Sequence, residues 1–262
     1  MIERQVRKME KLFPMMLDEP EAESCGVGMA YGLFAFLLMP ALLSLSVTSA
    51  LGLGDDASLI WYELAYHGIN FGVMLLTFFG YLREAFFNVI HQPKKVFGTA
   101  GICAAVIVVF RLVMVLLAIF RGNRLLADAS FGSLLTTEAD LLYYSTAMLQ
   151  AEPLWGTICV ILLTPITTSC LFYASIFAPA CTSRPWLGYL LAAIVPGVAH
   201  LSLVFCLWPM EQQMAVYFLQ LPVHLLACWS YQKTDTVWTP IFTHLFANLA
   251  LTPVLLWFMG IL

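Results

Sequence analysis

The chain has 262 residues, of which 61% are hydrophobic and 11% are charged, and its formal net charge is −4. A soluble domain is about half apolar and a quarter charged, so this composition argues against a soluble globule and is typical of an integral membrane protein. The sequence contains no run of basic residues, which argues against nucleic acid as a partner.

The first 24 residues alternate basic and apolar groups, a pattern that predicts a short helix lying on a membrane surface. Seven apolar stretches follow, each near the ~20 residues that a spanning helix needs. We place them at about 26–53, 59–82, 97–120, 154–178, 186–208, 214–231 and 237–261. The sequence therefore predicts an all-α fold. It is a polytopic transmembrane bundle of about seven spanning helices after an N-terminal interfacial helix, and residues 1–262 form a single integral membrane domain.

Most basic side chains fall on one side of this layout. That side holds Arg4, Arg7, Lys8, Lys11, Arg83, Lys94, Lys95, Arg184 and Lys233, and the other side holds Arg121 and Arg124. By the positive-inside rule the N-terminus is then cytoplasmic, and seven spans place the C-terminus outside. The loop 121–153 is predicted to be partly helical and interfacial, because it mixes leucines with acidic residues.

Several costly polar side chains lie within the predicted spans. An ionisable group there costs about 2.5–3.5 kcal/mol on insertion scales, and such groups usually face the interior of the bundle. The set is Glu63, His67, Asn70, Arg111, His200, His224, His244 and Asn248. The first three share one face of the second span, and an ion pair between Glu63 and Arg111 is the simplest interpretation.

Four polar residues on three C-terminal spans lie at a similar depth. At ~1.5 Å per residue, they lie about 10–21 Å from the cytoplasmic ends of their helices. They are Thr168, His200, His244 and Asn248. Facing helices can assemble a site from such side chains. The alternative is that each histidine only bonds a neighbouring helix, which is worth about 0.6–2 kcal/mol.

The segment 231–248 reads YQKTDTVWTPIFTHLFAN. It contains Tyr-x-x-Thr and then Trp-x-Pro-x-x-x-His-x-x-x-Asn, through Tyr231, Thr234, Trp238, Pro240, His244 and Asn248. This pattern resembles the last motif of the CPBP family of CAAX-protease and bacteriocin-processing membrane proteins, which includes the type II CAAX prenyl endopeptidases. The family's preceding Phe-x-x-x-His motif is matched through His200, with Pro196 at the phenylalanine position.

The family's first motif, Glu-Glu-x-x-x-Arg, is degenerate in this sequence. In the stretch TPITTSCLFYASIF, Thr168 and Ser169 stand where the glutamates belong, and Tyr173 replaces the arginine. We therefore treat these three as candidate binding residues and expect a CPBP-like core over residues 154–252. The resemblance implies an intramembrane peptidase chemistry, in which a glutamate and a histidine activate a water that attacks a peptide carbonyl.

By the same resemblance, His200 would polarise the water, and His244 and Asn248 would form the oxyanion hole. A hydroxyl cannot replace the missing carboxylate base. The resemblance therefore implies a catalytically impaired intramembrane protease homologue in a bacterial plasma membrane. Its buried polar cavity would bind a peptide, a lipid, a prenylated protein or a membrane-protein partner, as in bacteriocin immunity or partner regulation. No cofactor and no metal is expected.

Three other functions stay open. An active endopeptidase could have a rearranged base, either Glu63 or Glu152, or could use Ser169 as a nucleophile. A metal site could be built from the imidazoles of His67, His200, His224 and His244, although their spacings match no zinc motif. A transporter could use the helix-breaking Pro165, Pro196, Pro222 and Pro240.

Overall fold

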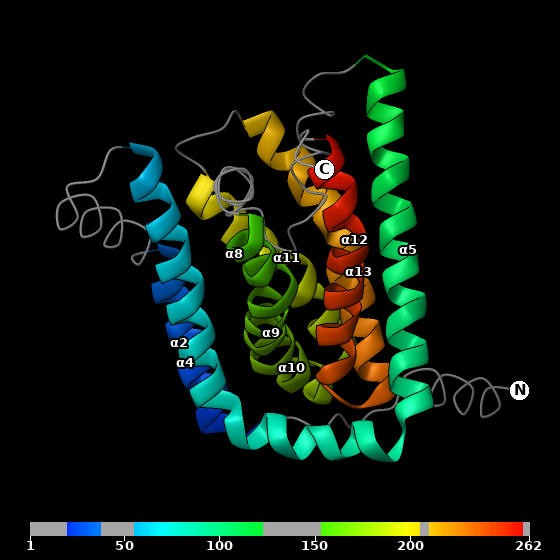
Figure 1. The fold of residues 1–262 in the computed structure, drawn as a ribbon. Coiled ribbons are helices and arrows are strands. Elements are labelled where there is room, and N and C mark those ends of the chain that lie inside the picture. Colours follow the sequence, from blue (N-terminus) through cyan, green and yellow to red (C-terminus); the bar gives the residue numbers. More distant parts are fainter. Residues whose placement is uncertain (1–19, 38–54, 123–152, 205–209, 259–262) are drawn as a thin grey trace, which may run out of the picture.

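The computed structural model describes residues 20–37, 55–122, 153–204 and 210–258. Within these ranges the chain forms a helical bundle without strands, so the prediction of an all-α fold is confirmed (Figure 1). Its helices are α2 (Ala22–Leu37), α4 (Asp55–His91), α5 (Pro93–Phe120), a composite helix over 153–183, α11 (Pro185–Val204), α12 (Met210–Thr234) and α13 (Trp238–Phe258).

Two predicted interfacial segments lie largely outside the described residues. Residues 1–19 of the N-terminal helix predicted over 1–24 are outside these ranges. So are residues 123–152 of the predicted loop 121–153, which include Glu152. The first predicted span is described only in part, as α2, because residues 38–54 are also outside these ranges.

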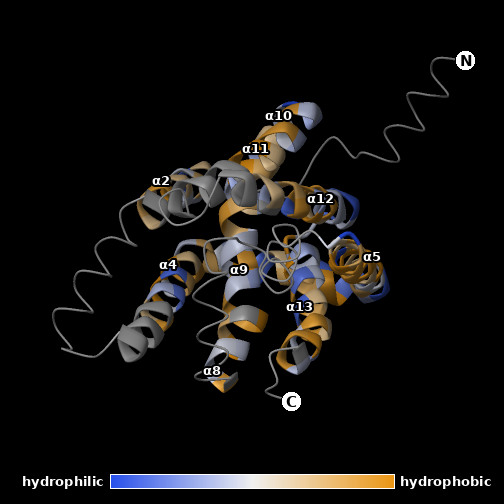
Figure 2. Cartoon of the chain, turned by 90° about the horizontal axis from the view of Figure 1, so that it is seen from above, coloured by the Kyte–Doolittle hydropathy of each residue, from blue (hydrophilic) through white to orange (hydrophobic). Residues whose placement is uncertain are grey.

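Four helices in the described ranges are long and apolar enough to cross a membrane. They cover Leu64–His91, Pro93–Phe120, Leu154–Ser183 and Trp238–Trp257, and α11 adds a shorter apolar segment, Pro185–Pro196. Large apolar side chains are also exposed along the outer helices. The ribbon of α5, coloured by hydropathy, is largely orange, which marks hydrophobic residues (Figure 2). Exposed apolar area of this extent suits lipid rather than water, and the chain is an integral membrane protein.

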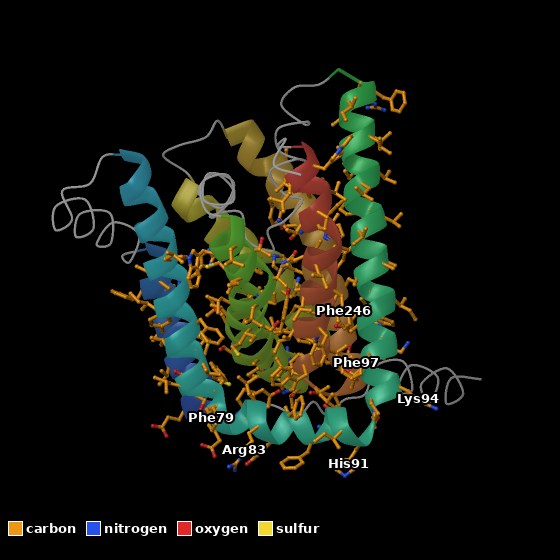
Figure 3. All side chains as sticks on the ribbon, viewed as in Figure 1. Phe79, Arg83, His91, Lys94, Phe97 and Phe246 are labelled. Carbon is orange, nitrogen blue, oxygen red and sulfur yellow. The ribbon has the colours of Figure 1, made fainter. Side chains whose placement is uncertain are left out.

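The second half of α4 differs from the prediction, which ended this span at residue 82. The helix continues to His91. It turns sharply, and its last part crosses the end of the bundle and carries Arg83 (Figures 1 and 3). Leu82, Ala85 and Val89 recur at helical spacing and are all buried. This apolar stripe explains why the segment packs across the bundle instead of forming a loop.

The crossing part of α4 is fastened to the turn between α12 and α13. The indole Nε1 of Trp238 donates to the Leu82 carbonyl at 2.8 Å, and Thr236 Oγ1 donates to the Ala85 carbonyl at 3.1 Å. Asp235 turns the chain with a left-handed φ of 58°, which a short polar side chain tolerates. The start of α13 is therefore fixed relative to α4.

The composite helix over 153–183 contains two π-helical segments, η2 (Cys159–Leu163) and η3 (Ser169–Phe177). Each of them ends two residues before a proline, Pro165 or Pro179. Proline has no N–H, so the α-helical bond that its position would normally donate is missing. The lost bond accounts for the change from α to π spacing at both places. The three α-helical pieces of the composite helix are α8 (Pro153–Ile158), α9 (Thr164–Thr168) and α10 (Ala178–Ser183).

Helix α2 packs closely against η3 through glycines one turn apart. A Cβ on Gly28 would lie 2.9 Å from the buried Phe78 ring and would collide with the Ser175 hydroxyl. A Cβ on Gly32 would lie 2.5 Å from Leu171. Small residues four apart let two membrane helices approach in this way.

The close contact at α2 makes Gly28→Ala destabilising. Because the added methyl group meets a buried ring and a buried hydroxyl, we expect the free energy of unfolding to fall by about 1–3 kcal/mol. Gly26→Ala is the matched control, since it lies on the same helix and no atom lies within 4 Å of its added Cβ. Urea or SDS titration in lipid measures both variants, and equal stabilities would contradict the packing of α2 on η3.

Candidate functional site

A tyrosine hydroxyl joins two histidines at the centre of the bundle. Tyr173 lies on η3, and its hydroxyl oxygen is 2.9 Å from Nδ1 of His224 on α12 and 3.0 Å from Nε2 of His244 on α13. The three side chains are between 0% and 2% exposed. Three helices are thus connected by a pair of hydrogen bonds that water does not reach.

The aromatic rings around this hydroxyl are also in contact. The Tyr173 and His244 rings are parallel to within 4°, with centroids 5.8 Å apart. The edge of His224 meets Phe172, with centroids 5.9 Å apart and an interplanar angle of 77°. Stacking and hydrogen bonding together hold both imidazoles in one orientation.

The start of α13 explains how His244 reaches this position. Pro240 lies in the first turn of the helix, where a missing N–H costs nothing. His244 and Asn248 then follow at intervals of one turn, so they share a face. Helices α9 and α13 are in contact and run in opposite directions (Figure 1). Because Tyr173 meets His244, Ser169 and Asn248 are both displaced towards the same end of the bundle.

The two hydroxyl residues at the glutamate positions are fully buried but differ in their bonds. Thr168 Oγ1 donates to the Thr164 carbonyl at 2.8 Å, an ordinary bond within its own helix. Ser169 Oγ has no hydrogen-bond partner in the described part of the chain. The Thr168 hydroxyl thus bonds its own backbone, whereas the Ser169 hydroxyl has no partner among the described residues.

Two residues that the sequence singled out cannot be placed in the site. His200 lies on α11 and Glu63 lies on α4, but their side chains are outside the described part of the structure. The role of His200 therefore stays a prediction. The same holds for the ion pair of Glu63 with Arg111.

The other polar residues of α4 bond neighbouring helices. His67 Nδ1 lies 3.3 Å from Thr164 Oγ1 on α9, and the Tyr31 hydroxyl on α2 donates to Asn70 Oδ1 at 2.8 Å. These contacts fit the alternative considered from the sequence, in which intramembrane polar groups serve helix packing.

Sequence reasoning missed the contribution of α12 to this cluster. His224 was considered only as a packing or metal-binding residue, and Gln220 was not considered. Gln220 is fully buried, and its Oε1 accepts a bond of 2.8 Å from Nη2 of the buried Arg111 on α5. The two α12 residues are four apart, and this spacing indicates a shared helix face but not which helix that face contacts.

The chemistry open to this cluster is set by its residue types. In the described part of the chain, the buried polar side chains are imidazoles, hydroxyls, amides and one guanidinium, with no aspartate or glutamate. No group of three or more His, Cys, Asp or Glu side chains among the described residues could hold a metal ion. The arrangement can donate and accept hydrogen bonds, but these residues offer no carboxylate base.

Three other residues of the last motif support the fold rather than the site. The Tyr231 hydroxyl bonds the Tyr81 hydroxyl on α4, and Thr234 Oγ1 lies 2.6 Å from Thr239 Oγ1 across the turn. Trp238 bonds the carbonyl of Leu82 at the crossing part of α4. These bonds fix the turn from which α13 begins, and so they fix the height of His244.

Comparison with known proteins bears on the same part of the chain. The family model for type II CAAX prenyl endopeptidase Rce1-like proteins matches residues 150–250. No curated protein and no solved structure gives a match. The matched range contains the Tyr173–His244 contact. Residues 150–250 are thus similar to the type II CAAX prenyl endopeptidase Rce1-like proteins, as the resemblance of the last motif suggests.

Proposed function

We propose that this integral membrane protein is a catalytically impaired CAAX-protease homologue that binds a peptide, a lipid or a membrane partner at its buried polar site. One observation carries the proposal. The polar cluster around Tyr173, His224 and His244 is buried, yet the described buried side chains include no carboxylate. Among the described residues, the site therefore keeps groups that can bind a carbonyl and offers no carboxylate that would activate a water.

The two hydroxyl residues at the family's glutamate positions support the hypothesis that the protein is catalytically impaired. Hydroxyls do not ionise near neutral pH, so neither Thr168 nor Ser169 can act as a carboxylate base. The Thr168 proton is already committed to the Thr164 carbonyl. Fixed donors remain useful without a base, because a peptide or lipid carbonyl buried in the bundle needs a hydrogen bond there.

A second function is favoured by Ser169. Its hydroxyl is fully buried and has no hydrogen-bond partner in the described ranges. A serine that acts as a nucleophile would have its hydroxyl unoccupied in this way before the substrate binds. An endopeptidase with a rearranged base would attack through this oxygen and would need a histidine within reach. An activity assay must test whether the protein is such an endopeptidase.

We place the whole chain in one integral membrane domain with residues 154–252 as its CPBP-like core. The orientation follows from charge. Lys94 lies at the start of α5, Arg184 lies between α10 and α11, and Lys233 lies at the end of α12. These helix ends lie at one end of the bundle, where the crossing part of α4 also carries Arg83 (Figures 1 and 3). By the positive-inside rule this end is cytoplasmic, in a bacterial plasma membrane, with the N-terminus on the same side.

The hypothesis of a catalytically impaired protease predicts that the protein cleaves no peptide. Purified protein in nanodiscs, incubated with a farnesylated peptide ending in a CAAX sequence, should release no product above the level of the His244→Ala variant. Mass spectrometry of the peptide checks this. Product that disappears in His244→Ala would contradict the proposal, and its further loss in Ser169→Ala would establish the nucleophile alternative.

The hypothesis that the buried polar site binds a ligand predicts that the protein has affinity for the same peptide. Because His244 would donate to a ligand carbonyl, His244→Ala should weaken binding about tenfold or more, which corresponds to about 1.4 kcal/mol. His91→Ala is the matched control, since His91 is exposed at the end of α4 and bonds the Phe87 carbonyl of its own helix. Fluorescence anisotropy measures the three affinities. Equal affinities, or no binding by the wild type, would contradict the proposal.

A further inference from the structure

Two exposed lysines begin α5, at the end of the bundle that the last part of α4 crosses. Lys94 and Lys95 directly follow Pro93 at the start of the helix, and Lys94 points away from the bundle (Figure 3). The sequence contains no acidic residue between Glu84 and the end of α5. The N-terminal end of the helix dipole is also positive, so it adds to these two charges instead of offsetting them. The junction of α4 and α5 is therefore a local concentration of positive charge.

Tryptophans on α13 mark the depth of this junction in the membrane. The apolar segment Trp238–Trp257 has 20 residues. At ~1.5 Å per residue it is about 30 Å long, which is the thickness of the hydrocarbon core. Tryptophan is enriched at both membrane–water interfaces. Trp238 therefore lies at the level of the lipid headgroups, at the same end of the bundle as the crossing part of α4.

The crossing part of α4 lies at this same depth. The Phe86 ring meets the Trp238 ring edge to face, with centroids 5.2 Å apart and an interplanar angle of 70°. Phe87 and Ile90 are 55% and 59% exposed. Helices that expose apolar side chains beside basic ones lie in the plane of a membrane interface. Lys94 follows the end of α4 by three residues, so its ammonium group lies among the lipid headgroups.

An apolar surface continues from Lys94 towards the membrane centre. Phe97 lies one turn further along α5, is 43% exposed, and contacts the partly buried Phe242 ring of α13 with centroids 4.9 Å apart. Phe242 stacks in turn on Phe246, with centroids 6.0 Å apart and an interplanar angle of 15°. Figure 3 shows Phe97 and Phe246 in this order from the end of the bundle inwards. A lipid whose headgroup lies at Lys94 can thus pack an acyl chain against these rings.

We propose that Lys94 and Lys95 bind the headgroup of an anionic phospholipid from the surrounding leaflet, with an acyl chain of that lipid against Phe97. The class of partner follows from charge complementarity. Two ammonium groups at headgroup level attract a lipid with a net negative charge, whereas the cationic group of a zwitterionic headgroup offsets that attraction. This surface is separate from the buried polar cluster around Tyr173, so the inference does not rest on the proposed function.

Other basic residues at this end are less suited to the same role. Arg83 is followed directly by Glu84, whose carboxylate offsets its charge. The Lys233 ammonium lies 4.5 Å from the centroid of the Trp229 ring, a cation–π contact that already stabilises its charge. Arg184 is one cation in the link between α10 and α11. The adjacent lysines at the start of α5 are therefore the pair that we assign to the lipid.

The test is the affinity of the whole chain for two lipids. Native mass spectrometry in detergent, with added phosphatidylglycerol or phosphatidylcholine, measures the dissociation constant of the first bound lipid. We expect phosphatidylglycerol to bind more tightly. The attraction of one basic residue to an anionic membrane surface corresponds to about fivefold in affinity. The double variant Lys94→Gln with Lys95→Gln should therefore bind phosphatidylglycerol about 25-fold more weakly and phosphatidylcholine as before.

Two control variants separate this site from general electrostatic attraction. Arg184→Gln removes one charge from an exposed side chain at the same end of the bundle, and it should leave the affinity for phosphatidylglycerol nearly unchanged. Lys94→Arg with Lys95→Arg keeps both charges and should keep the affinity. Because all of these side chains are exposed, the variants should fold as the wild type does.

Three results would overturn the proposal. The first is equal affinity of the wild type for the two lipids. The second is an unchanged affinity for phosphatidylglycerol in the lysine-to-glutamine double variant, or a loss in Arg184→Gln as large as in that variant. The third is displacement of phosphatidylglycerol by soluble glycerol phosphate, because the lysines would then bind a free anion instead of a lipid. No peptide is added, so these outcomes are independent of whether the buried site binds one.

Discussion

A polar side chain that is buried between membrane helices must find its partner inside the protein, because neither lipid nor water supplies one. The Tyr173 hydroxyl meets this requirement for two histidines at once, and it does so from a third helix. The structure depends on this contact, since without it two imidazoles would each bury a nitrogen that has lost its bond. The contact also fixes the register of η3 against α12 and α13.

Several separate features of the chain bring the hydroxyl to that place. The π spacing of η3 ends before Pro179, and a wider helical turn is often found where a side chain must be re-aimed at a functional site. Helix α2 packs closely against η3 at Gly28 and so supports the position of η3. On the other side, Trp238 and Thr236 hold the turn before α13 against α4. Residues of the last family motif thus act as much through the fold as through the site.

The sequence was sufficient for the class of fold and for part of the site, for identifiable reasons. Long apolar stretches predict spanning helices directly, whereas the crossing part of α4 was missed because Arg83 and Glu84 make it look like a loop. Motif spacing placed His244 and Tyr173 in one site, and the structure brings them into contact. Spacing within one helix identifies a face but not its neighbour, which is why the contact of His224 could not be foreseen. The Thr168 hydroxyl bonds the Thr164 carbonyl of its own helix, and a role for Thr168 in binding a ligand stays a prediction.

The central claim is that the Tyr173 hydroxyl and His224 stabilise the bundle through each other. A double-mutant cycle with Tyr173→Phe and His224→Leu, measured as free energies of unfolding in lipid, tests it most directly. The account predicts that the double variant loses less than the sum of the single losses, by about 0.6–2 kcal/mol, as for other hydrogen bonds between membrane helices. Strictly additive losses would show that the two groups do not interact, and they would contradict the account.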